Sequence, residues 1–130
     1  MILNLTQHKA TPEQKAAGVW DFPDSVRGTL TDLLTFNGIP TKESMHGRAE
    51  AIYQFAKMHE PISSSGAVNL CQTVMIGGAP FFMSTLESVL IAHGWKPCYA
   101  FSKRVVTEQK QEDGSVVKVS SFKHEGFFEV

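Results

Sequence analysis

The chain has 130 residues, of which 42% are hydrophobic and 19% charged, and its formal net charge is −1. This length suits one domain with its own core, and the ordinary composition excludes a disordered or repetitive protein. The charge provides no basic footprint for duplex nucleic acid. No stretch approaches the roughly 18 apolar residues of a membrane span, and the first residues do not resemble a signal peptide. We therefore expect one cytoplasmic domain over residues 1–130, with no membrane association.

Clear local signals mark the first strand and the first helix. Ile2–Thr6 is short and apolar, which is typical of a strand. Thr11 can cap a helix, Pro12 suits the first helical position, and Gln14 follows three residues after the cap. Gly18 is then placed to end this short helix.

Two longer helices are predicted next. Apolar residues recur with helical spacing after Pro23, at positions 26, 30, 33 and 34. Thr41 is placed to cap the longest helix of the chain, which Glu60 and Pro61 should end. The serine-rich residues 63–66 are expected to form a loop.

The second half of the chain predicts the centre of a sheet and a hairpin. Ala67–Ile76 is the most apolar run and is typical of a strand covered on both faces. The Gly77-Gly78-Ala79-Pro80 turn leads into a helix that Gly94 should end. Cys98–Phe101 is predicted to be the next strand, which continues past Ser102–Arg104 into Val105 and Val106. Asp113-Gly114, flanked by residues 107–110 and 116–119, is a strong hairpin signal.

This order of elements indicates a Rossmann-like α/β domain. Strands that alternate with helical crossovers imply a mainly parallel central sheet flanked by helices, here with a C-terminal antiparallel β-hairpin. Phe127–Val130 is expected to add a last strand. Cys71 and Cys98 fall in the predicted buried strands, where they are expected to be small core residues in a reducing compartment. No spacing of Cys or His predicts a metal site, and no cofactor is implied.

In an open α/β sheet, ligands bind beyond the carboxyl ends of the strands, near helix N-termini. Three segments are expected to meet there, the third if its strand ends near Phe101. The candidate ligand-binding residues are Thr6, Gln7, Gly77, Gly78, Ser102, Lys103 and Arg104, and the candidate catalytic residue is His8.

Each of these segments also has an ordinary structural interpretation. The two glycines either let the backbone approach a phosphate closely or only make a tight strand-to-helix turn. His8 is either a general acid or base or a histidine of a surface loop. Lys103 and Arg104 are the best anion-binding pair of the chain, or they lie on a solvated strand edge.

The opening Met1–His8, taken with Thr11–Gln14, resembles that of small CRISPR-accessory proteins related to the CARF (CRISPR-associated Rossmann fold) group. The matching pieces further along are Gly77–Pro80 and Phe101–Arg104. The resemblance implies a sensor, sink or ring nuclease for cyclic oligoadenylates. The opening and the basic strand end also resemble uncharacterised proteins of phages and mobile elements, and that resemblance carries no activity.

Two hypotheses of function follow. In the first, the chain is a nucleotide-binding domain that binds or cleaves a cyclic oligonucleotide second messenger without a metal, as a ring nuclease would. In the second, it is a non-enzymatic accessory factor of phage or mobile-element origin. Its exposed hairpin, from Lys103 to Lys123, would then contact a protein partner by strand addition. A homodimer is expected, because a two-fold axis often completes a strand-end site in a small α/β domain.

Overall fold

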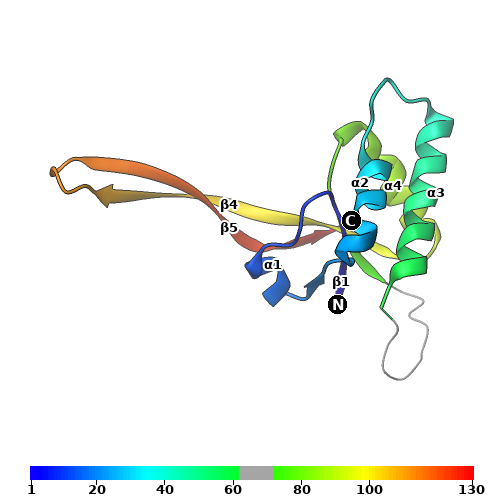
Figure 1. Cartoon of the computed structure of the whole chain (residues 1–130), viewed down its shortest axis with the longest axis horizontal. Helices are drawn as coiled ribbons and strands as arrows, with labels where there is room; N and C mark the ends of the chain where they lie inside the picture. Colours follow the sequence, from blue (N-terminus) through cyan, green and yellow to red (C-terminus); the bar gives the residue numbers. More distant parts are fainter. Residues whose placement is uncertain (62–71) are drawn as a thin grey trace.

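The computed structural model describes residues 1–61 and 72–130, and it has a mixed α/β architecture (Figure 1). The elements are β1 (Ile2–Leu5), α1 (Pro12–Ala16), β2 (Val19–Trp20), α2 (Asp24–Leu34), α3 (Lys42–His59), β3 (Thr73–Ile76), α4 (Pro80–Ala92), β4 (Lys96–Lys110) and β5 (Val116–Glu129). Among the described helices, none combines the length and the apolar character that a membrane crossing requires.

Reciprocal hydrogen bonds start α1 and α3 where the sequence predicts. The Thr11 side chain accepts from the backbone N–H of Gln14, and the Gln14 side chain accepts from the backbone N–H of Thr11. Thr41 and Ser44 form the same arrangement at α3. Because these side chains satisfy backbone groups that the first helical turn leaves free, local sequence determines where both helices begin.

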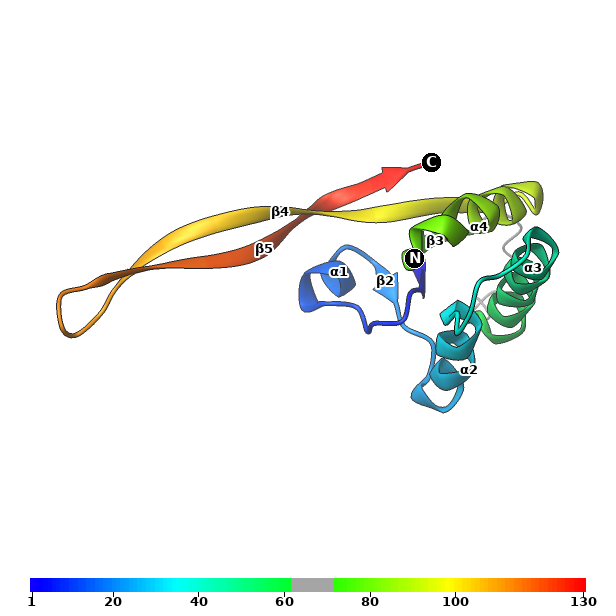
Figure 2. The same ribbon diagram turned by 90° about the horizontal axis from the view of Figure 1, so that it is seen from above.

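The five strands form one sheet in the order β2-β1-β3-β4-β5. β1 pairs in parallel with β2 and with β3, and β3 pairs in parallel with β4. Only β5 is antiparallel, against β4. The predicted mainly parallel sheet with a C-terminal antiparallel hairpin is therefore confirmed. Figure 2 shows α2, α3 and α4 grouped together, whereas α1 lies apart from them beside β2.

The strands bury side chains on both faces of the sheet, because successive residues of a strand point to opposite sides. The larger core lies between one face and the three long helices; its strand residues are Leu3, Leu5, Val74 and Ile76. A smaller cluster on the other face joins Val19, Met75 and Cys98 to Ala10, which precedes α1. β1 and β3 are thus covered on both sides.

Cys98 is a free, buried cysteine on β4, as predicted. Burial raises the pKa of its thiol to about 11, with a further contribution from the negative charge of Glu129. The strand predicted over Ala67–Ile76 begins at Thr73 in the structure. Its first part, with Cys71 and the predicted serine-rich loop, lies outside the described residues.

The predicted continuation of the strand past Ser102–Arg104 into a C-terminal hairpin is confirmed. The condition that the strand ends near Phe101 is not met, and the last strand is not a separate one. β4 does not end near Phe101 but continues to Lys110, and the expected last strand at 127–130 is the end of one continuous β5. The pairing survives an irregularity between Phe101 and Ser102, where Glu125 has no partner on β4. Gly126 follows at a φ of +151°, a conformation open to glycine, so the extra residue is absorbed as a bulge. We call residues 101–126 the arm.

Truncation of a buried isoleucine should test the position of the larger core. Ile52 of α3 is 0% exposed, whereas Ile39, in the loop before α3, is fully exposed. Ile52→Ala should lower the free energy of unfolding by about 2–5 kcal/mol, because it removes buried methyl groups and leaves a cavity. Ile39→Ala should change it by less than about 0.5 kcal/mol. Urea unfolding of both variants measures the difference, and equal effects would contradict the packing described.

Candidate functional site

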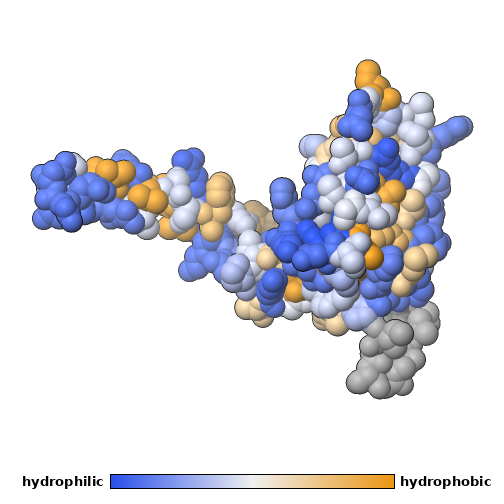
Figure 3. All heavy atoms as spheres, viewed as in Figure 1, coloured by the Kyte–Doolittle hydropathy of each residue, from blue (hydrophilic) through white to orange (hydrophobic). Residues whose placement is uncertain are grey.

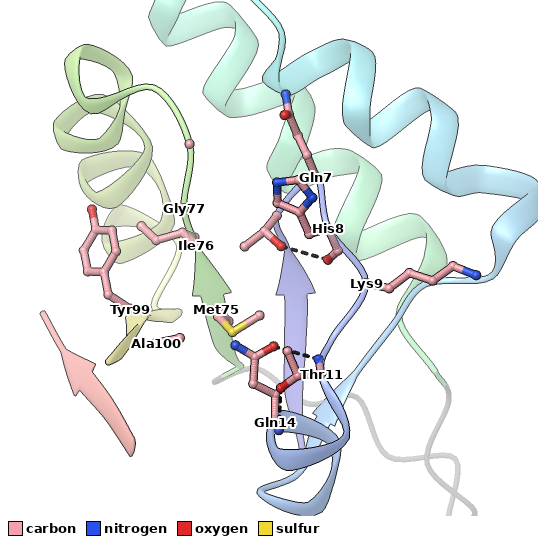
Figure 4. Close-up of a pocket in the computed structure, with 12 residues that line it drawn as sticks. Gln7, His8, Lys9, Thr11, Gln14, Met75, Ile76, Gly77, Tyr99 and Ala100 are labelled. Carbon is pink, nitrogen blue, oxygen red and sulfur yellow. Dashed lines mark hydrogen bonds between the residues drawn. The ribbon is translucent and has the colours of Figure 1, made fainter. Parts of the chain in front are cut away.

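A pocket of about 410 Å³ opens at the carboxyl ends of β1 and β3 (Figure 4). One wall is the Thr6–Lys9 loop together with Thr11 and Gln14. The opposite wall is Ile76–Gly78, and the remaining lining residues are Met75, Tyr99 and Ala100. A pocket of this size falls within the range of small-molecule sites.

The sheet order explains why a pocket forms here. β1 connects through α1 to β2, on one side of it, whereas β3 connects through α4 to β4, on the opposite side. The two connections leave adjacent strands in opposite directions, so a crevice opens between them. In open α/β sheets, ligands bind at such a point, outside the carboxyl ends of the strands.

The conformation of the β1–α1 loop depends on one buried polar side chain, Asn4. Its Nδ2 donates to the backbone oxygen of His8 at 2.8 Å and to Oδ1 of Asp21 at 2.7 Å. Its Oδ1 accepts from the backbone N–H of Thr6 at 3.0 Å and lies 2.7 Å from the Thr6 hydroxyl. Asn4 is 0% exposed, so every one of these bonds is made in place of water. The amide thus closes the loop over the end of its own strand.

Asp21 and Arg27 hold the same loop from outside. The Asp21 carboxylate accepts from the backbone N–H of Ala10 with both oxygens, at 3.0 and 3.2 Å. Arg27 lies 3.8 Å from Asp21 Oδ1 and donates through Nη2 to the backbone oxygen of Gln7 at 3.3 Å. Both side chains are largely buried. The loop backbone is therefore anchored at three points between Gln7 and Ala10, which leaves its side chains to define the pocket wall.

Glycine is required at one position of the opposite wall. Gly78 has a φ of +150°, in the region that side chains disfavour, so it lets the chain turn from β3 into α4. Gly77 lies against the first wall: a Cβ atom there would be 3.5 Å from Cγ2 of Thr6. The two strand ends therefore approach each other closely. α4 has no side-chain cap, so no side chain satisfies the backbone N–H groups of its first turn.

Tyr99 borders the pocket as a neutral hydrogen-bond donor. Its hydroxyl donates to Oε1 of Glu87 on α4 at 2.6 Å. Burial, followed by this hydrogen bond and the negative charge of Glu87, raises the pKa of Tyr99 well above its ordinary value. The phenol therefore stays protonated at neutral pH, and its hydroxyl proton is used in the hydrogen bond to α4.

The structure brings together two of the three predicted segments. Thr6, Gln7, His8, Gly77 and Gly78 all line the pocket. In Figure 4 the His8 ring lies on the side of its loop that faces Gly77, whereas the Lys9 side chain points away, toward the Asp24 carboxylate 3.1 Å from its Nζ.

The third segment lies elsewhere. Ser102, Lys103 and Arg104 are exposed on the arm, because β4 continues past Phe101, and Arg104 Nε donates to Ser120 Oγ at 2.8 Å. None of the three lines the pocket.

The lining residues that sequence reasoning missed are Lys9, Thr11, Gln14, Met75, Ile76 and Ala100. Thr11 and Gln14 were identifiable as a capping pair, but the capping pattern does not tell on which side of the sheet α1 lies. Among the described residues, no group of three or more His, Cys, Asp or Glu is arranged to hold a metal ion.

The fold and the pocket define a mixed α/β protein with a candidate small-molecule site at its strand ends. The family model described as the uncharacterized protein MJ1673 family matches residues 1–128, and the chain belongs to this family. Comparison with curated proteins and with solved structures found no match.

Replacing Asn4 with aspartate tests the anchoring of the loop. Asn4→Asp puts a carboxylate oxygen where Nδ2 donates to His8 and Asp21, so it should destabilise the fold by several kcal/mol at pH 7. Burial beside Asp21 should raise the pKa of the new carboxyl in the folded state. The loss should therefore shrink as the pH falls and the group binds a proton.

The matched control is the exposed Asn37, where Asn37→Asp should change stability little at any pH. Thermal unfolding between pH 4 and pH 8 compares the two variants. A loss in Asn4→Asp that does not depend on pH would contradict the proposed contact with Asp21.

Proposed function

We propose that this protein binds a nucleotide at the carboxyl ends of β1 and β3. The observation that carries the proposal is the position of the pocket, between two strands whose connections diverge. The strand order β2-β1-β3-β4 agrees with a Rossmann-like fold of the flavodoxin type, in which the ligand lies between the first and third strands. The location of the pocket in the sheet therefore supports the proposal more strongly than any single side chain does.

The chemistry of the two walls suits a phosphate group. The Gly77-Gly78 backbone can approach an anion closely, and it leads into α4, whose N-terminus carries a partial positive charge. On the opposite wall His8 is exposed and faces Gly77, where it can donate to a phosphate oxygen. Met75, Ile76 and Tyr99 supply apolar surface for a base or a ribose.

Within the nucleotides, we propose the class of cyclic oligonucleotides, to which the resemblance to CARF-related proteins points. The pocket is open to solvent at the exposed His8 and Gly78, so a ring larger than one nucleotide can seat one unit in it and leave the others outside. Lys103 and Arg104 lie on the same chain but outside the pocket, so they are not part of this binding site.

The same site has the group needed to cleave such a ring. The 2′-hydroxyl of the bound ribose loses its proton to a base and attacks the adjacent phosphorus, and the 5′-oxygen leaves and takes up a proton. The products are a 2′,3′-cyclic phosphate and a 5′-hydroxyl, and this step consumes no water. We propose His8 as the acid or base, because its imidazole faces the phosphate position and an imidazole can both accept and donate a proton.

Incubation with a series of cyclic oligoadenylates tests the binding. At least one ring size should raise the thermal unfolding temperature. Gly77→Ala should reduce that rise, because the added methyl group projects toward Thr6 across the pocket. Gly47→Ala, on an exposed part of α3 where a Cβ meets nothing within 4 Å, is the matched control and should respond like the natural chain. No rise with any ring size would contradict the proposal.

Chromatography of the same mixtures tests the cleavage. His8→Ala should lower the rate of ring opening by about 10²- to 10⁴-fold. It should reduce the thermal shift only in part, because the backbone groups of the pocket still hold the ring after one phosphate donor is lost. His46→Ala, on the exposed surface of α3, should leave both unchanged. A thermal shift without any linear product from the natural chain would assign the protein to binding alone.

A further inference from the structure

The arm contacts α1 where it joins the body of the protein, through His124 and Glu13, and we call this junction the root. The arm projects as a two-stranded ribbon in both views of the fold (Figures 1 and 2). The side-chain hydrogen bonds of its outer part stay within the arm, as between Arg104 and Ser120 and between Thr107 and Val119. A two-stranded ribbon is marginally stable in water, and a third strand is the usual remedy.

The outer edge of β5 offers a run of free backbone groups to such a strand. Gln111 donates to the oxygen of Ser115 at the turn, so the alternation of an antiparallel ladder turns the N–H groups of even-numbered residues of β5 away from β4. His124 agrees with this pattern, since its outward N–H is taken by Oε2 of Glu13 on α1 at 3.0 Å. Because of this hydrogen bond, the N–H group of His124 at the root is not available to a further strand. In the described sheet β5 is an edge strand, and no further strand pairs with the outward groups from Val116 to Phe122.

Apolar side chains accompany this free edge. Val116 and Phe122, near its two ends, are 56% and 74% exposed, and Val119 lies midway between them. Figure 3 shows hydrophobic side chains among hydrophilic ones along the arm. Val116 and Phe122 each lie three residues from Val119. A second copy of β5 running in the opposite direction can therefore place its own apolar side chains against these three.

The charges of the arm do not select the partner. Lys103 lies directly opposite Lys123 near the root, next to Arg104. In a reversed neighbour centred on Val119, Glu112 and Asp113 of the turn would lie opposite Gly126 and Glu125, near the Glu13 carboxylate that binds His124. The pairing therefore rests on the apolar side chains and the free backbone groups.

We propose that two copies of this chain pair antiparallel along the outer edges of β5, with the two-fold axis at Val119. Val116 then lies opposite the partner's Phe122, and Val119 opposite the partner's Val119. All four outward N–H groups from Val116 to Phe122 then find acceptors on the partner. An isologous interface of this kind requires a self-complementary surface, which is the property that favours a second copy over a different protein.

Cysteine cross-linking of the full chain tests the register, in a background with Cys71 and Cys98 replaced by alanine. Val119→Cys should form a disulfide-linked dimer on mild oxidation, because residues facing each other across the axis have Cα atoms close enough to bridge. Val117→Cys is the matched control: its two copies would be four residues out of register, about 13 Å apart along the strands, and should stay unlinked. Linkage through Val117→Cys instead would overturn the proposed axis.

Light scattering of the purified natural chain tests the dimer itself, which should have twice the 14.4 kDa mass of the chain. Ser120→Pro removes an outward N–H and leaves the β4–β5 ladder intact, so this variant should be monomeric with an unchanged circular dichroism spectrum. A monomeric natural chain would overturn the proposal. A dimer that Ser120→Pro does not weaken would overturn it too, because the interface would then lie elsewhere.

Discussion

The hydrogen bonds of the buried Asn4 amide are the interaction on which the candidate site depends. The amide lies in β1, inside the sheet, yet its partners are the backbone of Thr6 and His8 and the carboxylate of Asp21. Leaving any of these groups without a partner costs about 1–3 kcal/mol, so the loop has one favourable conformation. In that conformation His8 faces the glycine turn after β3. The same side chain thus joins the core of the sheet to the wall of the pocket.

The position of β1 inside the sheet explains why the loop that follows it lines a pocket. A loop of the same structure at the end of an edge strand would face solvent. Here β1 and β3 are neighbours whose connections diverge, and Gly77 and Gly78 let the second strand end come close to Thr6. The rigid loop, the diverging connections and the glycine turn together form the pocket. This combination, rather than any single motif, is the basis of our proposal that a nucleotide binds there.

Much of the fold was predictable because its signals are local. Thr11 with Gln14, and Thr41 at the longest helix, cap helices through neighbours in sequence, and Asp113-Gly114 forms its turn in the same way. The bulge within the arm was not predictable, since the register of β4 and β5 on its two sides depends on the pairing of distant residues. The candidate site was predictable only in part. The segments after β1 and β3 line one pocket, whereas Lys103 and Arg104 lie outside it, because β4 does not end near Phe101.

Nuclear magnetic resonance of the ¹⁵N-labelled chain during titration with a cyclic oligoadenylate tests the central claim most directly, because it reports on every backbone amide separately. If a nucleotide binds between β1 and β3, the amide signals of Thr6–Lys9 and of Gly77 and Gly78 should shift together, whereas that of Gly114 at the tip of the arm should not. An unchanged spectrum, or shifts confined to the arm, would contradict the account.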